Sequence, residues 1–128
     1  MRSLDPDHAH KLCHYEDERG VIEDLLGPID SVTRIFTEKG HIRGNHYHEF
    51  TTQWVYVLWG KLLIVSQLPN TVISNQEYGP GMMAREDPGI PHAWKALETC
   101  LVLVFTRGPR SAKDYESDTH RLEVPLLK

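Results

Sequence analysis

The sequence predicts an all-β sandwich or barrel, and two observations carry this prediction. Short apolar segments rich in Val, Ile, Leu, Trp and Tyr follow one another closely, with glycine or proline between them. Segments of about four to eight such residues at close spacing are typical of an all-β domain. An apolar pattern with the period of a helix does not extend over a useful length. The clearest strand candidates are SVTRIF, QWVYVLWG, KLLIVSQL and CLVLVF.

Length and charge restrict the class of protein. A chain of 128 residues fits a single domain, which we expect over residues 17–128, preceded by a flexible polar arm at 1–16. The net charge of −4 and the lack of a basic run argue against nucleic acid as a partner. The sequence has no apolar run long enough to span a membrane and no apolar leader, so a cytoplasmic location is expected. The two cysteines are too few for a disulfide framework.

The strand that begins at Gln53 has two apolar faces, which predict that one face lines the domain interior and that the other packs on a second sheet or a partner subunit. Strand alternation places Gln53, Val55 and Val57 on one face and Trp54, Tyr56 and Leu58 on the other. Both faces are bulky and apolar, whereas a half-buried strand shows one polar face. One face should line the domain interior and the other should pack on a second sheet or a partner, so a homodimer is expected.

Histidines and glycines at fixed spacing mark the candidate site. His46 and His48 are two residues apart, so on a strand both side chains point to the same side. Gly40 precedes this pair by five intervening residues, Gln53 follows it after four, and Gly60 comes after six more. Further along, Gly81 is followed by a turn that contains Asp87-Pro88-Gly89 and then by His92.

These spacings resemble the two sequence motifs of the cupins, which are small jelly-roll β-barrels. The first motif agrees at every spacing, with Gln53 where cupins carry a glutamate. In the second, the proline is displaced by one position and Ala96 replaces an asparagine. The resemblance implies a divalent metal (Zn²⁺, Fe²⁺, Mn²⁺, Ni²⁺ or Cu²⁺) held by His46, His48, Gln53 and His92. Because glutamine brings no negative charge, two interpretations stay open: an altered metal site, or catalytic histidines without a metal.

A narrower resemblance is to cupins that act on nucleotide sugars. Asp17-Glu18-Arg19-Gly20 is similar to a motif near the start of dTDP-sugar 3,5-epimerases. Residues 43–48, RGNHYH, together with Gln53 and Gly60, are similar to dTDP-sugar 3,4-ketoisomerases, whose late Asp-Tyr tail motif resembles Asp114-Tyr115 and Asp118. The zinc cupin domain of a bifunctional capsular-sugar enzyme also carries the hexapeptide RGNHYH.

The chemistry that this resemblance implies is proton removal next to the carbonyl of a keto sugar. His46 or His48 is then the candidate base, and a tyrosine that returns a proton is sought among Tyr56, Tyr78 and Tyr115. Candidate phosphate ligands are arginines, whose forked donors suit a diphosphate, and Trp94 is a candidate pocket wall. The arginine candidates are Arg43, Arg34 and Arg19.

The sequence therefore predicts a cupin enzyme for a small molecule, most specifically an isomerase or epimerase of a nucleotide-linked keto sugar. Two other functions remain open. One is a metal-dependent oxidoreductase, such as a dioxygenase that uses Fe²⁺. The other is a cupin that binds a metal or a sugar without turning it over.

Overall fold

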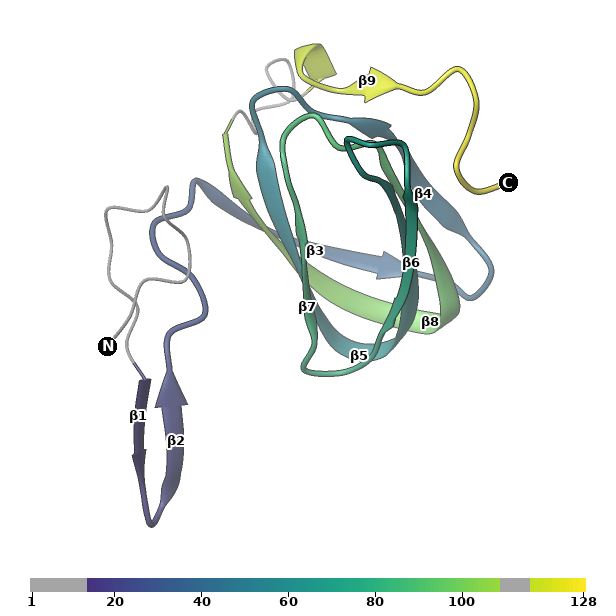
Figure 1. The fold of residues 1–128 in the computed structure, drawn as a ribbon. Coiled ribbons are helices and arrows are strands. Elements are labelled where there is room, and N and C mark those ends of the chain that lie inside the picture. The colour runs from purple at the N-terminus through teal and green to yellow at the C-terminus, as the bar shows by residue number, and fades with distance from the viewer. Residues whose placement is uncertain (1–13, 109–115) are drawn as a thin grey trace.

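The computed structural model describes residues 14–108 and 116–128, and its fold is built almost entirely from β-strands, as predicted. Two long strands, β5 and β8, form the body together with five shorter ones, while β1 and β2 stand apart from it (Figure 1). The strands are β1 His14–Asp17, β2 Gly20–Glu23, β3 Ser31–Thr37, β4 Ile42–Tyr47, β5 Thr52–Gln67, β6 Ile73–Tyr78, β7 Met83–Glu86, β8 His92–Arg107 and β9 His120–Arg121.

The hairpin of β1 and β2 spans the expected boundary between the N-terminal arm and the domain. His14–Asp17 is a strand that pairs antiparallel with Gly20–Glu23, so the predicted end of the arm at residue 16 falls inside a hairpin. The tight turn is closed by Asp17, whose carboxylate accepts hydrogen bonds from the backbone and guanidinium of Arg19. Residues 1–13, the rest of the predicted arm, lie outside the described residues.

The two long strands each serve both layers of the barrel. The first half of β5 pairs with β7 and with the second half of β8, which also pairs with β3. The second half of β5 pairs with β6 and with the first half of β8, which continues to β4 and β9. Each of β5 and β8 therefore bends from one sheet into the other, as in a jelly roll.

Gly60 marks the bend of β5. The register between β5 and β8 shifts around residues 57–62, and Gly60 has a φ of 89°. A Cβ at this position would lie 2.3 Å from the carbonyl oxygen of Thr99 and 2.5 Å from Cβ of Cys100. Only glycine allows β5 and β8 to approach this closely at the corner. This explains the glycine that ends the first sequence motif.

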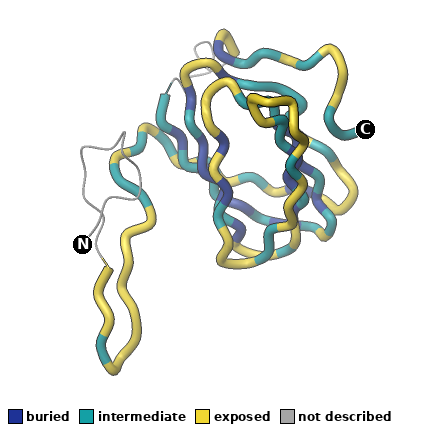
Figure 2. Tube along the Cα trace, viewed as in Figure 1, coloured by how far each residue is buried: buried dark blue, intermediate teal, exposed yellow. Residues whose placement is uncertain are grey.

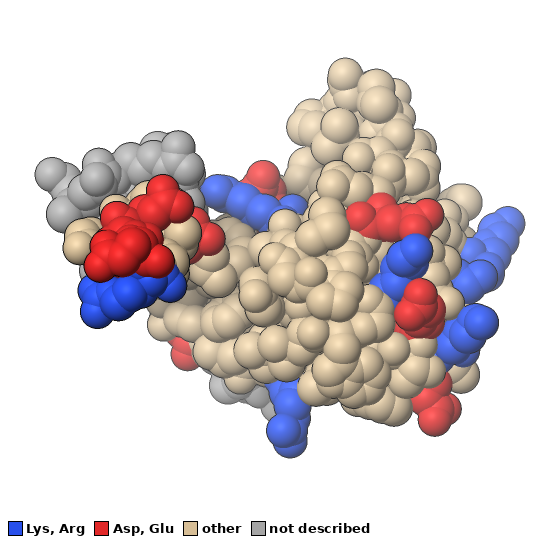
Figure 3. Space-filling model, turned by 90° about the horizontal axis from the view of Figure 1, so that it is seen from below, with Lys and Arg blue, Asp and Glu red and all other residues tan. Residues whose placement is uncertain are grey.

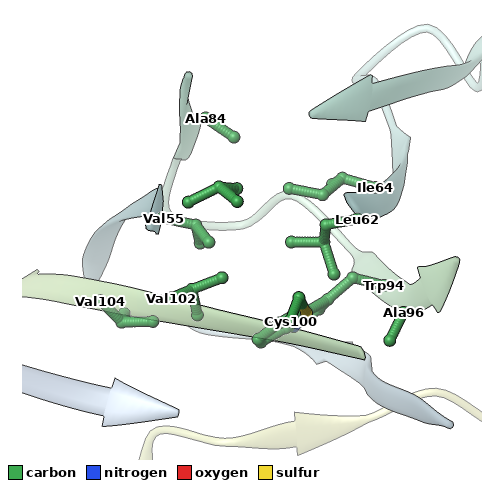
Figure 4. Close-up of a cluster of buried hydrophobic side chains, with 10 residues drawn as sticks. Val55, Leu62, Ile64, Ala84, Trp94, Ala96, Cys100, Val102 and Val104 are labelled. Atoms are coloured by element: carbon green, nitrogen blue, oxygen red, sulfur yellow. The ribbon is translucent and has the colours of Figure 1, made fainter. Parts of the chain in front are cut away.

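The core lies between the two layers and is drawn from the inward faces of the long strands (Figures 2 and 4). Cys100 is fully buried here as a free thiol, and burial raises its pKa. The buried cluster consists of Val55, Val57, Leu62, Ile64, Ala84, Trp94, Ala96, Cys100, Val102 and Val104. Before the bend of β5, Val55 and Val57 share a face with Gln53, as the alternation predicts; past the register shift, the inward residues are Leu62 and Ile64.

The outer face of β5 is covered within the chain at Trp54, whereas Leu58 on the same face is exposed. Trp54 is buried, and the guanidinium groups of Arg85 and Arg107 lie 5.8 and 5.5 Å from its ring centre. Seen from below, the body shows a wide area without charged side chains, while acidic and basic residues gather at its rim (Figure 3).

The described residues contain no helix with the length and apolarity needed to cross a membrane. The homodimer and the cytoplasmic location stay predictions.

Candidate active site

A cavity of about 240 Å³ opens between the two layers, close to the C-terminal segment. Its wall combines charged, amide and imidazole groups with apolar side chains. The lining residues are Ile35, Arg43, Gly44, His46, Gln53, Val55, Glu86, His92, Trp94, Val104, Glu116, Thr119 and Arg121. Ligand pockets commonly measure about 300–1,000 Å³, so this cavity suits a small polar molecule or one sugar ring.

The local sequence Gly44-Asn45 directs His46 toward this cavity. Both residues have positive φ, 89° and 57°, and the register of β4 against β8 shifts between Gly44 and His46. Gly44 also passes within van der Waals distance of the β8 backbone, since a Cβ there would lie 3.0 Å from the carbonyl oxygen of His92. Asparagine is one of the few other residues that adopts positive φ readily. The pair therefore forms a β-bulge that redirects the strand at the site.

The structure brings His46, His48 and His92 together. The ring centres of His46 and His48 are 4.7 Å apart, and His92 lies 4.9 and 5.6 Å from them. One ring nitrogen from each histidine lies within 4.8 Å of the others. His46 and His48 share a face as the alternation predicts, and the topology adds His92 because β4 pairs with the start of β8.

Backbone carbonyls fix the orientation of two of the rings. Nδ1 of His48 donates a hydrogen bond to the carbonyl of Asp118 over 3.0 Å, and Nδ1 of His92 donates to that of Ile90 over 3.1 Å. In both rings this directs Nε2 away from the backbone. Such hydrogen bonds are the usual means by which proteins orient histidines for metal binding or proton transfer.

The three histidines differ in their affinity for protons. Burial, together with His92, His48 and Arg121, lowers the pKa of His46 to about 3. Burial also lowers the pKa of His48, partly offset by its bond to Asp118. For His92 burial alone acts downward, but the Glu86 carboxylate outweighs it and raises the pKa. His46 is therefore a weak base, which argues against the predicted role of His46 as the proton acceptor.

Glu86 is a residue of the site that the sequence analysis missed. It is 5% exposed at the end of β7, and its Oε2 lies 2.7 Å from Nε2 of His92. In the strand register it stands opposite Gln53, which is also buried and lines the cavity. The site thus contains a carboxylate, one strand away from the position where the cupin motif has one. Glu86 is two residues from Ala84 on β7, and both are buried on the same face. Strand alternation is therefore the sequence signal that indicates an inward position for Glu86.

The three histidines fit a divalent metal ion. Neutral imidazoles are good ligands for such ions, and the lowered pKa values of His46 and His48 keep both rings neutral near pH 7. The buried Nδ1 of His46 has no hydrogen-bond partner in the structure. A buried polar atom of this kind usually indicates a bound water or ion. The residues that would hold the metal are His46, His48 and His92, with Gln53 and Glu86 beside them.

Two of the predicted substrate-binding residues lie at the cavity and one does not. Trp94 is buried in the cavity wall. Arg43 also lines it, while its guanidinium donates to the Thr37 hydroxyl and to the Phe36 carbonyl. Arg34 is exposed on the outer face of β3, because the next residue, Ile35, is the one that faces the cavity. Strand alternation therefore removes Arg34 from the site.

The tyrosine predicted to be catalytic is also on the wrong face. Tyr56 has the opposite parity to Gln53 and Val55 on β5, and it is not among the residues that line the cavity. Tyr78 packs against the core near Glu86, and burial together with that carboxylate raises its pKa. Tyr115 lies outside the described residues. Arg19 belongs to the separate hairpin, away from the cavity.

The C-terminal segment forms one side of the cavity. Glu116, Thr119 and Arg121 line it, and β9 pairs with β4 opposite His46 and Tyr47. In the sequence, Asp118 is marked only by a tail motif, and no motif marks Arg121, whose charge contributes to the lowered pKa of His46.

Two polar side chains anchor this segment to the barrel. The buried carboxylate of Asp118 accepts hydrogen bonds from the backbone of Glu49 and Phe50 and from the Thr51 hydroxyl. Asn45 binds the segment further on: its Oδ1 accepts from the backbone of Leu126 and Leu127, and its Nδ2 donates to the Leu127 carbonyl.

A jelly-roll barrel with a histidine cluster in its cavity defines a cupin-like protein, and the comparison of sequences agrees. A family model described as Cupin matches residues 25–117. The chain belongs to the cupin family, as the two motifs predicted. A search of curated proteins finds no match.

Solved structures with this fold include sugar-modifying cupins. A 3,4-ketoisomerase, QdtA of Thermoanaerobacterium thermosaccharolyticum, crystallised as a double mutant with TDP, is 23% identical with a TM-score of 0.66, over 86% of this chain and 83% of that one. The dTDP-4-dehydrorhamnose 3,5-epimerase of Sulfolobus tokodaii is 20% identical with a TM-score of 0.59, over 78% and 69%. CapF, a capsular polysaccharide assembling protein of Staphylococcus aureus, is 21% identical with a TM-score of 0.66; the match covers 92% of this chain but 34% of CapF. At these identities the likeness concerns the fold.

Proposed function

We propose that the protein is an isomerase or epimerase of a nucleotide-linked keto sugar. The observation that carries this proposal is the cluster of three imidazoles and one carboxylate at a cavity large enough for a single sugar ring, with His46, His92 and Glu86 in its wall and His48 buried behind them. The QdtA structures with TDP and with TDP-4-keto-6-deoxyglucose support the choice of substrate class.

The reaction requires a group that takes the proton next to the carbonyl and a group that stabilises the enolate oxygen. In the site without a metal, His92 with Glu86 is the better proton acceptor and donor, because their contact raises the pKa of the imidazole. His46, on β4, lines the cavity beside His92, and His48 adjoins both rings. In the alternative with a divalent metal, the ion would supply Lewis-acid polarisation of the keto oxygen, and His92 would be a ligand instead of the proton acceptor.

Binding of the diphosphate falls to the arginines at the cavity. Arg43 and Arg121 both line it and come from neighbouring strands, β4 and β9. Guanidinium groups form charge-assisted, forked hydrogen bonds with phosphate oxygens. The sugar would then lie inside the cavity, with the nucleotide toward its opening.

Deuterium exchange tests the proposal. The protein is incubated in D₂O with dTDP-4-keto-6-deoxyglucose and with other nucleotide-linked 4-keto sugars, and deuterium at the sugar carbons is read by mass spectrometry and NMR. We expect incorporation next to the carbonyl, its loss in His92→Gln, and no change in His41→Gln, since His41 is exposed. Lack of exchange across the whole panel would refute the isomerase and epimerase functions.

A second function is favoured by one observation, the three ring nitrogens within 4.8 Å of each other. Such a site also suits an oxidoreductase that uses Fe²⁺. Oxygen uptake by the iron-loaded protein, without sugar exchange, would favour this alternative.

A further inference from the structure

We propose that Glu86 is the carboxylate ligand of the metal site, in place of the glutamate that Gln53 replaces. This inference concerns how this chain binds a divalent cation, and it does not depend on the identity of the sugar or on the reaction.

The first argument is position. Gln53 and Glu86 are partners in the antiparallel register of β5 and β7, so their backbones lie side by side. Both side chains are buried, at 7% and 5% exposure, and both line the cavity that contains His46 and His92. Neighbouring strands are about 4.8 Å apart. A carboxylate moved from β5 to β7 therefore stays within reach of the same cluster, given the three rotatable bonds of a glutamate side chain.

The second argument is the contact that Glu86 makes. Its Oε2 lies 2.7 Å from Nε2 of His92, which is the ring nitrogen left by the bond between Nδ1 and Ile90. The carboxylate thus faces the same point as the lone pair that would ligate the ion. Despite this short contact, Oε2 of Glu86 is a buried atom without a hydrogen-bond partner in the structure. A divalent cation at Nε2 of His92 would lie beside this oxygen.

The third argument is charge. With Gln53 in the motif position, the donor set of three imidazoles and an amide is neutral and leaves a buried dication uncompensated. Burying an unpaired charge is costly. Among the residues that the structure describes, the cavity wall has one other carboxylate, that of Glu116, which is exposed and lies 3.9 Å from the guanidinium of Arg121. Glu86 is therefore the carboxylate placed to balance the ion.

Metal titration of matched variants tests this assignment. The affinity for Zn²⁺ is measured by competition with a chromophoric chelator, and the coordination of Co²⁺ is followed by its visible spectrum. We expect Glu86→Gln to weaken binding about 10- to 100-fold or more and to change the Co²⁺ spectrum. The control variant Glu116→Gln removes the other carboxylate at the cavity and should leave both readings unchanged.

A charge-relocation variant sharpens the test. In the Glu86→Gln background, Gln53→Glu returns the carboxylate to the motif position and should restore most of the affinity. Unchanged or tighter binding by Glu86→Gln alone would overturn the proposal, because Glu86 would then only compete with the metal for His92. Failure of the wild-type protein to bind any of the divalent metals would overturn it too.

A crystal structure of the wild-type protein with Zn²⁺ gives a reading that does not depend on how the variants fold. We expect a Glu86 oxygen at about 2.0–2.2 Å from the zinc ion. A zinc ion held by the three histidines and Gln53, with Glu86 outside bonding distance, would refute the proposal. Because neither measurement uses a sugar, the result is separate from that of the deuterium exchange.

Discussion

The carbonyl oxygen of Asp118 accepts a hydrogen bond from Nδ1 of His48 over 3.0 Å, and the carboxylate of Asp118 binds the loop that follows His48. One residue of the C-terminal segment thus orients a histidine of the site and also holds the backbone that carries it. Asp118 is a positioning residue, and the first two predictions concern it.

Replacing Asp118 by asparagine should destabilise the protein. The neutral amide cannot accept all the hydrogen bonds that come from Glu49, Phe50 and Thr51. A hydrogen bond to a charged group contributes about 1.5–3 kcal/mol. We therefore expect the free energy of unfolding to fall by about 1–3 kcal/mol. Urea unfolding at pH 7 measures it. Glu116→Gln, at an exposed position nearby, is the control, and an equal effect there would contradict the assigned role.

The contribution of Asp118 should depend on pH with a definite sign. Burial acts upward on its pKa, but the hydrogen bonds from Thr51, Glu49 and Phe50 outweigh it and lower the pKa. A lowered pKa means that the unfolded chain takes up the proton first. The stabilisation is therefore complete above the unfolded pKa of about 3.9 and is lost as the pH falls through the folded value. The difference in stability between wild type and Asp118→Asn should narrow below about pH 4; a constant difference down to pH 3 would contradict this.

Substitution of Gly60 should disrupt the corner of β5. An added Cβ would meet the Thr99 carbonyl at 2.3 Å and would strain a residue with a φ of 89°. Backbone strain and overpacking each cost about 1–3 kcal/mol, so Gly60→Ala should lose about 2–5 kcal/mol in urea unfolding. Gly79→Ala is the control, because no atom lies within 4 Å of its added Cβ. Similar losses in both variants would show that the corner has no special need of glycine.

Arg121 rather than Arg34 should bind the diphosphate. Arg121 lines the cavity, whereas Arg34 lies on the outer face of β3. Loss of one charge-assisted hydrogen bond corresponds to about a tenfold or greater change in affinity. We expect Arg121→Gln to weaken the binding of dTDP by at least this factor in calorimetry, and Arg34→Gln to bind as the wild type does. The reverse result would move the phosphate site to the outside of the barrel.

Tyr56 should be dispensable for the reaction. It has the opposite parity to the residues of β5 that line the cavity. Tyr56→Phe should therefore retain the deuterium exchange proposed above, measured under single-turnover conditions. The comparison is Tyr78→Phe, which removes the hydroxyl near Glu86. Loss of exchange in Tyr56→Phe, with the fold intact by circular dichroism, would contradict the geometry.

The parts of the fold and site that the sequence predicts are those set by local periodicity. Alternation places His46 with His48 and Gln53 with Val55, and the motif spacing connects them to His92. The same alternation also excludes two residues that were chosen for their chemistry. Tyr56 and Arg34 are suitable as catalytic or phosphate-binding groups, but strand alternation places each on an outer face. In both cases the neighbouring residue, Val55 or Ile35, lines the cavity.

For Glu86, alternation indicates only a face of β7 shared with Ala84; its place beside Gln53 comes from pairing between strands distant in sequence. Its partner in the register, Gln53, precedes it by a whole strand, a loop and a further strand. In the sequence the glutamate stands among charged residues before a turn, a context typical of surface segments. Arg121 was missed for a related reason, since β9 reaches the cavity only by pairing with β4.

The two anchors of the C-terminal segment limit how this chain can change in length. Asp118 fastens one end of the segment and Asn45 fastens the other, at Leu126 and Leu127. A residue inserted or deleted between them would release one anchor and withdraw a wall of the cavity. The hairpin of β1 and β2 stands apart from the barrel and contributes no wall to the cavity. In related sequences, insertions and deletions should therefore be found in that hairpin and be rare between Asp118 and Leu126.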